Sequence, residues 1–221
     1  MEIIAVLKSL LLVPVTLLPI INPLSTAPIF VSTVGGDHTL AARLARQVAI
    51  NSWFVIVTSI LIGTYVLAVF GISLPVVRIG GGLLVASTAW RLLHRSDEDE
   101  VHARAAQETY EMTHAEVVRR SFFPVTFPLT TGPGTIAASI ALGAQIPSSP
   151  TLYVAGVFVA IVGAAIVSFV LYLIFKNSTA VVAWLGDVGM LVLTRLMAFI
   201  LLCIGIQIMW YGWAELNGFH V

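Results

Sequence analysis

Two stretches of this sequence carry the same six-residue pattern, and they decide the fold. The first is Pro23-Leu24-Ser25-Thr26-Ala27-Pro28, and the second, 105 residues further along, is Pro128-Leu129-Thr130-Thr131-Gly132-Pro133. Each lies in a long apolar stretch, where a proline removes a backbone hydrogen bond and breaks or kinks a helix. The pattern therefore predicts two broken helices, one in each half of the chain.

The sequence around both motifs is too apolar for a protein that folds in water. Of the 221 residues, 58% are hydrophobic and 10% are charged, and the mean hydropathy is +0.99. A soluble domain carries about 25% charged residues, which cover its water-facing surface. We therefore expect an all-α integral membrane protein in contact with membrane lipid. Basic and acidic residues balance to zero net charge, so nothing indicates a nucleic-acid partner.

Six apolar stretches are long enough to cross a bilayer, which needs about 20 predominantly apolar residues. They cover residues 3–34, 47–70, 74–93, 121–145, 151–175 and 188–213. The first and the fourth contain several prolines each, so neither can be one regular helix. Non-helical backbone is tolerated at membrane depth only where protein or a water-filled cavity satisfies its polar groups.

The hexapeptide belongs to a longer internal repeat. The same offset places residues 46–70 on residues 151–175, and Arg78 corresponds to Arg195 at an offset of 117. Duplication of a three-span unit explains these matches. Because three is odd, the second copy crosses the membrane in the opposite direction, which makes an inverted-topology repeat. The predicted parts are a first three-helix repeat, a charged linker and a second three-helix repeat: 1–93, 94–120 and 121–221.

Lysine and arginine residues near span ends set the orientation of a membrane protein, because cytoplasmic loops are enriched in them. Placing both termini outside puts eight basic residues in cytoplasmic loops: Arg43, Arg46, Arg91, Arg95, Arg104, Arg119, Arg120 and Lys176. The two predicted outer loops hold no basic residue, and Lys8 is the main exception to the pattern. We expect both termini on the outer side, with linker 94–120 in the cytoplasm as a solvated connection or a docking site for a partner.

The two motifs supply the candidate substrate-binding residues. Inverted repeats with helices interrupted at corresponding positions place a binding site near the middle of the membrane. The hydrogen-bonding candidates are Asn22, Ser25, Thr26, Thr130 and Thr131, and the helix-breaking candidates are Pro23, Pro28, Pro128, Gly132 and Pro133. Half-helix N-termini that point inward would favour an anionic group. Each hydroxyl taken alone could instead bond back to its own helix.

Arg78 and Arg195 complete the candidate site, because arginine inside a membrane span is rare and usually functional. They lie toward opposite ends of their predicted spans, so the pair could line the two mouths of one pathway. Contact with lipid headgroups, or with the end of a neighbouring helix, explains them equally well.

The sequence lacks the residues that several kinds of catalytic and metal site require. No Asp or Glu lies in the apolar interior of a predicted span, and all five His residues lie outside the spans. No cluster has metal-ligand spacing, and Cys203 is the only cysteine. We therefore expect no catalytic residue, metal or cofactor, and a protein that is not an enzyme.

These residues resemble the MarC family of bacterial inner-membrane proteins along essentially the whole chain. The motifs that carry the resemblance are Ile21 to Thr26, Arg78-Ile79-Gly80-Gly81-Gly82, Pro128 to Ile136 and Arg195-Leu196-Met197. The resemblance implies a six-span protein of the inner membrane, related in fold to the lysine-exporter superfamily of small-molecule exporters. It implies no particular substrate, and linker 94–120 matches no family pattern.

The leading functional hypothesis is a secondary transporter that exports a small polar or amphipathic metabolite bound between the two breaks. A passive channel is the nearest alternative, and a structural or regulatory membrane protein without a transported solute is another. The small-residue face at Gly80-Gly81-Gly82 suits close helix packing within one chain or in a homo-oligomer alike.

Overall fold

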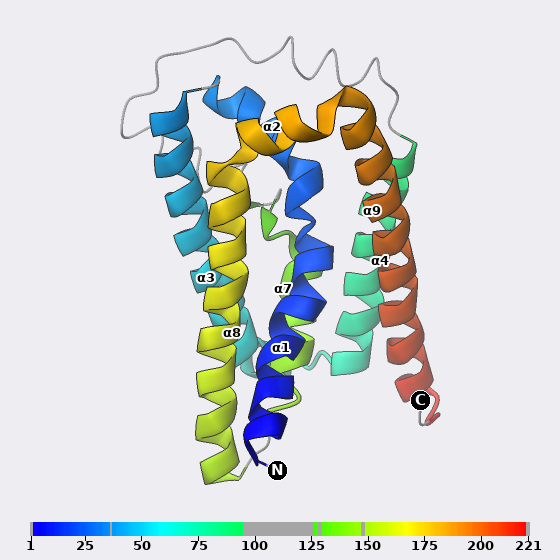
Figure 1. Cartoon of the computed structure of the whole chain (residues 1–221). Helices are drawn as coiled ribbons and strands as arrows, with labels where there is room; N and C mark the ends of the chain where they lie inside the picture. Colours follow the sequence, from blue (N-terminus) through cyan, green and yellow to red (C-terminus); the bar gives the residue numbers. More distant parts are fainter. Residues whose placement is uncertain (1, 36, 95–125, 128–129, 147–148, 220–221) are drawn as a thin grey trace.

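The computed structural model describes residues 2–35, 37–94, 126–127, 130–146 and 149–219 of the chain. Across these ranges the secondary structure is helical, with no β strand (Figure 1). The α helices are α1 (Glu2–Ile21), α2 (Pro23–Val34), α3 (His38–Val69), α4 (Leu74–Leu93), α7 (Pro133–Gly143), α8 (Pro150–Lys176) and α9 (Ser178–Leu216). The expected all-α class is confirmed.

Four helices are long and apolar enough to cross a membrane: α3, α4, Leu152–Lys176 of α8 and Val188–Leu216 of α9. α1 and α2 meet at a bend of 56° and together form a fifth, broken candidate. α7 is apolar but has 11 residues, whereas a full crossing needs about 20. The described residues therefore give a polytopic membrane protein with four or five candidate spans. Much of predicted span 121–145 before α7 lies outside the described residues.

α3 begins at His38, well before the predicted span start at residue 47, because Asp37 caps its first turn. One carboxylate oxygen of Asp37 accepts hydrogen bonds from the backbone N–H groups of Thr39 (2.7 Å) and Leu40 (3.3 Å). The Thr39 hydroxyl also donates to this oxygen, and this bond and the backbone bonds lower the pKa of Asp37. A capped N-terminus satisfies N–H groups that a helix leaves unpaired.

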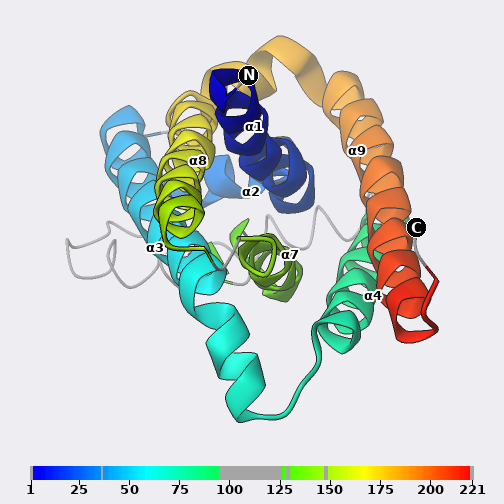
Figure 2. The same ribbon diagram turned by 90° about the horizontal axis from the view of Figure 1, so that it is seen from below.

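The long helices associate as two antiparallel pairs, α3 with α8 and α4 with α9 (Figures 1 and 2). In the first pair, the indole N–H of Trp53 donates to the Ile161 carbonyl oxygen at 3.2 Å. In the second pair the backbones touch, because a Cβ on Gly82 would lie 2.6 Å from the Gly205 carbonyl oxygen. Gly80, by contrast, faces open space within the described part of the chain. Gly82 therefore serves packing inside the chain.

The remaining helices, α1, α2 and α7, lie between these two pairs, as the view in Figure 2 shows. α7 packs against α3 and α4, and a Cβ on Gly143 would clash with the Ile60 carbonyl oxygen of α3. α1 packs on α8, where Gly163 closely approaches Val13. Phe30 of α2 stacks on Phe175 of α8 with ring centroids 4.8 Å apart, and both side chains are almost fully buried.

α9 is interrupted near its start at Gly186, whose φ of 65° and ψ of 174° are accessible only to glycine. The residues before this kink cross one end of the molecule beside α2, and those after it descend alongside α4 (Figure 1). Both described chain ends lie at the opposite end of the molecule. The predicted span 188–213 therefore covers most of α9 after the kink, whereas the segment before the kink was not predicted.

Candidate functional site

The first helix break lies at Asn22, directly in front of the first hexapeptide. Asn22 has the left-handed conformation φ 48°, ψ 60°, and it is the one non-glycine residue with positive φ among the described residues. Pro23 then occupies the first position of α2, where its missing N–H costs no helical bond. Pro28 lies inside α2, so the chain is helical through the first hexapeptide.

Two of the predicted residues at this break carry polar atoms with no hydrogen-bond partner in the described part of the chain. They are the side-chain N–H₂ group of Asn22, which is 6% exposed, and the hydroxyl of Ser25. An unsatisfied buried polar group costs about 1–3 kcal/mol, so such groups call for an explanation. The Thr26 hydroxyl differs, because it donates to the Pro23 carbonyl oxygen at 3.0 Å.

The second break lies inside the second hexapeptide. The backbone N–H and the hydroxyl of Thr131 both donate to the carbonyl oxygen of Thr126, at 2.7 Å and 3.0 Å. Gly132 is extended, with φ −76° and ψ 178°, and α7 begins at Pro133. Thr126, Thr130 and Thr131 are buried, whereas Pro133 is exposed. The prediction for Pro128 falls outside the described residues.

α3 contributes two polar residues beside this break that were not predicted. The Asn51 amide donates to the Thr126 hydroxyl oxygen at 3.5 Å, and the Gln47 amide donates to the Asn51 side-chain oxygen at 3.2 Å. These residues are four positions apart, the spacing that places two side chains on the same helix face. Two amide side chains four positions apart in an apolar span are the sequence signal that could have identified Gln47 and Asn51.

The two predicted arginines lie at opposite ends of the α4/α9 pair. Arg78 of α4 forms an ion pair with Glu215 in the last turn of α9. Arg195 of α9 donates to the carbonyl oxygen of Leu93, the last residue of α4, at 3.3 Å. Each arginine therefore contacts the C-terminal turn of the other helix, where a positive charge also interacts favourably with the helix dipole. The Glu215 partner was missed, because 137 residues separate it from Arg78.

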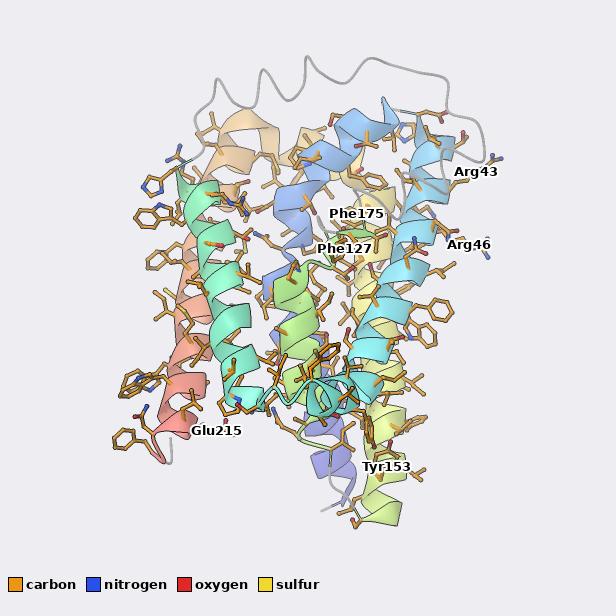
Figure 3. The ribbon with its side chains drawn as sticks, turned by 180° about the vertical axis from the view of Figure 1, so that it is seen from behind. Arg43, Arg46, Phe127, Tyr153, Phe175 and Glu215 are labelled. Atoms are coloured by element: carbon orange, nitrogen blue, oxygen red, sulfur yellow. The ribbon has the colours of Figure 1, made fainter. Side chains whose placement is uncertain are left out.

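A cavity of about 620 Å³ lies between α1, α4, α7 and α9, at the end of the molecule that holds both described chain ends. Its wall includes Leu12 and Thr16, the ion pair of Arg78 and Glu215, and residues of α7 beyond the second break. Figure 3 shows Glu215 at this end and Arg43 and Arg46 at the other. Among the predicted site residues that the structure describes, Arg78 alone lies in the cavity wall.

The comparison with known proteins agrees with this architecture. Residues 7–216 match the family model described as "MarC family integral membrane protein". This chain belongs to the MarC family. The inner membrane protein MarC of Escherichia coli is 29% identical over 207 residues, which cover 91% of this chain and 92% of that protein.

The inner membrane protein MarC of Shigella flexneri matches to the same extent. No solved structure shows a significant match to the chain. The predicted resemblance to the MarC family is confirmed. The relatives are named inner membrane proteins, and the four or five candidate spans agree with a protein that crosses the bilayer several times. Among the described residues, no group of three or more His, Cys, Asp or Glu side chains could hold a metal ion.

Proposed function

We propose that this MarC-family protein is a secondary transporter that exports a small polar or amphipathic metabolite without changing it chemically. The cavity beside the broken helices carries this proposal. Its volume of about 620 Å³ lies within the range of about 300–1,000 Å³ that small-molecule sites occupy. It adjoins α1 and α7, the helices on either side of the two breaks, which are the elements that form substrate sites in inverted-repeat transporters.

The proposal includes six spans arranged as two inverted three-helix repeats. In this arrangement α1–α2 corresponds to α7 with the residues before it, α3 to α8, and α4 to α9. The helix directions in Figure 1 support the correspondence, because α3 and α8 are antiparallel, as are α4 and α9. Helix packing supports it as well: α3 and α4 pack on α7 as α8 and α9 pack on α2.

Both termini are proposed to be periplasmic. Arg43 and Arg46 near the start of α3, Arg91 near the end of α4 and Lys176 at the end of α8 all lie at the end opposite the termini. Cytoplasmic ends of spans are enriched in such residues. The cavity then faces the periplasm, as expected for an exporter that has opened outward.

The helix pairs suggest which parts move. α4 and α9 have touching backbones at Gly82 and Gly205, so they are proposed to move as one unit. The second unit contains α3 and α8. A relative rotation of the two units about α1–α2 and α7 would close the cavity and expose the breaks from the cytoplasmic side. Asn22 and Ser25 would then bind the solute, because their polar atoms lack partners in the described structure.

The test starts by comparing metabolites in cells with and without this protein, which identifies the accumulated solute. The purified protein is then reconstituted in proteoliposomes, and exchange of that solute against a gradient is measured. The double variant N22G/S25A keeps a residue that tolerates the conformation at position 22 and removes both unpartnered polar groups. We expect it to lose at least about tenfold in flux, since buried hydrogen bonds to a solute provide strong discrimination.

The matched control is Ser87→Ala, because the Ser87 hydroxyl is exposed and donates to the Leu84 carbonyl oxygen of its own helix. This variant should transport like the unmodified protein. Unchanged flux in a folded N22G/S25A variant would remove the breaks from the transport pathway. Flux without exchange against a gradient would identify a channel instead.

A further inference from the structure

Among the described residues that line the cavity, one side chain is positive and one is negative, and they are paired with each other. Arg78 comes from the first turns of α4 and Glu215 from the last turn of α9. The Arg78 side chain is 21% exposed, whereas the Glu215 side chain is 45% exposed. The carboxylate is therefore the more accessible member, and it can leave the arginine for water more easily.

The rest of the cavity wall is neutral among the described residues. Thr16, Gln145 and Tyr211 provide polar groups, and Leu12, Leu142 and Ile208 provide apolar surface from three different helices. The cavity thus combines one guanidinium with a largely aliphatic wall. This combination fits a molecule with an anionic group at one end and an apolar body.

The ion pair also indicates which anion fits. A guanidinium has five N–H donors and stays charged at any relevant pH, and it binds a carboxylate with two parallel bonds. In the ion pair, the Arg78 guanidinium contacts the Glu215 carboxylate. A carboxylate already occupies this position, so a second carboxylate of similar size and single charge is the matching competitor. A phosphate group would carry close to two negative charges opposite one arginine.

We propose that the cavity binds a small amphipathic carboxylate, whose anionic group takes the place of Glu215 on Arg78 while its apolar body lies against Leu12, Leu142 and Ile208. Glu215 is then an internal competitor, displaced into water when the ligand binds. This inference rests on the proposed function, because it names the class of solute that the transporter would carry.

Three probes with the same apolar body test the proposal: 3-phenylpropanoate, the neutral 3-phenylpropanamide of nearly the same shape and the cationic 3-phenylpropylamine. Binding to the full-length protein in lipid nanodiscs is measured by calorimetry, with concentrations that extend into the millimolar range. We expect the carboxylate to bind at least about tenfold more tightly than the amide or the amine, because only the carboxylate forms an ion pair with Arg78. Equal binding of the amide, or no binding of the carboxylate, would overturn the proposal.

Glu215→Gln removes the competing charge and keeps the side-chain shape. We expect it to bind the carboxylate about three- to tenfold more tightly, because exposed ion pairs of this kind are weak but still have to be broken. Arg78→Gln should lose the preference for the carboxylate over the amide. The matched control Arg91→Gln, exposed at the other end of the same helix, should bind like the unmodified protein. Weaker binding by a folded E215Q variant would show that Glu215 is not a competitor.

The binding experiment and the transport test have independent outcomes, because equilibrium binding requires no flux. Carboxylate binding without any solute flux would leave the site intact and refute the transporter. Flux of an uncharged solute that depends on Asn22 and Ser25, without carboxylate binding, would support the transporter and refute the assigned ligand class.

Discussion

The two copies of the hexapeptide fold differently, although both begin and end with proline. In the first copy α2 starts at Pro23 and continues through Pro28, so the break falls in front of the motif. In the second copy Thr131 and Gly132 are not helical, and α7 starts at Pro133, the counterpart of Pro28. Proline thus marks positions where a helix can start, because its fixed φ suits the first turn. Which proline is used depends on its neighbours.

The neighbours differ in two ways. Position 27 is a buried alanine, the strongest helix former, whereas its counterpart Gly132 favours other conformations. Thr131 also donates two bonds to the Thr126 carbonyl oxygen, and the backbone bond has the five-residue spacing of a π-helical turn, which does not continue as a regular α-helix into α7. The first copy has no such contact among its described residues and turns at Asn22 instead. Each break therefore has its own local cause, which substitutions can separate.

The largest expected difference concerns the backbone at Asn22. A Cβ-bearing residue in the left-handed region costs about 1–2 kcal/mol, which asparagine tolerates better than alanine does. Asn22→Ala should therefore be less stable than Asn22→Gly by about 1–2 kcal/mol, since both variants lack the amide but only alanine is strained. Thermal unfolding in detergent measures the difference. Equal stability of the two variants would mean that the left-handed turn does not make the first break.

Thr131 and Thr26 give the next largest contrast. Thr131→Val removes a fully buried hydroxyl bond to the Thr126 carbonyl and should cost about 1 kcal/mol, a typical net hydrogen-bond contribution. Thr26→Val removes a partly buried bond within one helix turn and should cost less. The same unfolding measurement compares the two. A larger loss of stability for Thr26→Val than for Thr131→Val would show that the Thr26 hydroxyl, and not the Thr131 hydroxyl, contributes more to the stability of the fold.

The smallest effect is expected at Gly132. Its φ and ψ lie in the extended region open to any residue, so alanine fits this backbone conformation without strain. Gly132→Ala should raise stability by about 0.5 kcal/mol, because alanine restricts the unfolded chain more than glycine does. A clear loss of stability would indicate that the second break depends on glycine, as the first depends on a residue that tolerates positive φ.

The sequence predicted the features that depend on local composition. Apolar length identified α3, α4, α8 and α9, and the prolines identified both breaks. The position of each break was not predictable, because it depends on the φ of Asn22 and on the bonds of Thr131. The pairing of Arg78 with Glu215 depends on the packing of two helices that are distant in sequence. The kink at Gly186 lacked a signal, because an isolated glycine is common in membrane helices.

The most direct test of the central claim, a solute pathway beside the breaks, is cysteine accessibility across α1. In a Cys203→Ser background, Thr16→Cys places a thiol in the cavity wall. Val15→Cys places one at the preceding position, which is 67% exposed, does not line the cavity and is expected to face lipid. A membrane-impermeant maleimide is added from the side of the membrane that holds the termini. We expect rapid labelling of the Thr16 variant and almost none of the Val15 variant, because water fills the cavity and lipid covers the outer face. Equal labelling of the two positions, or no labelling at position 16 from this side, would contradict the pathway.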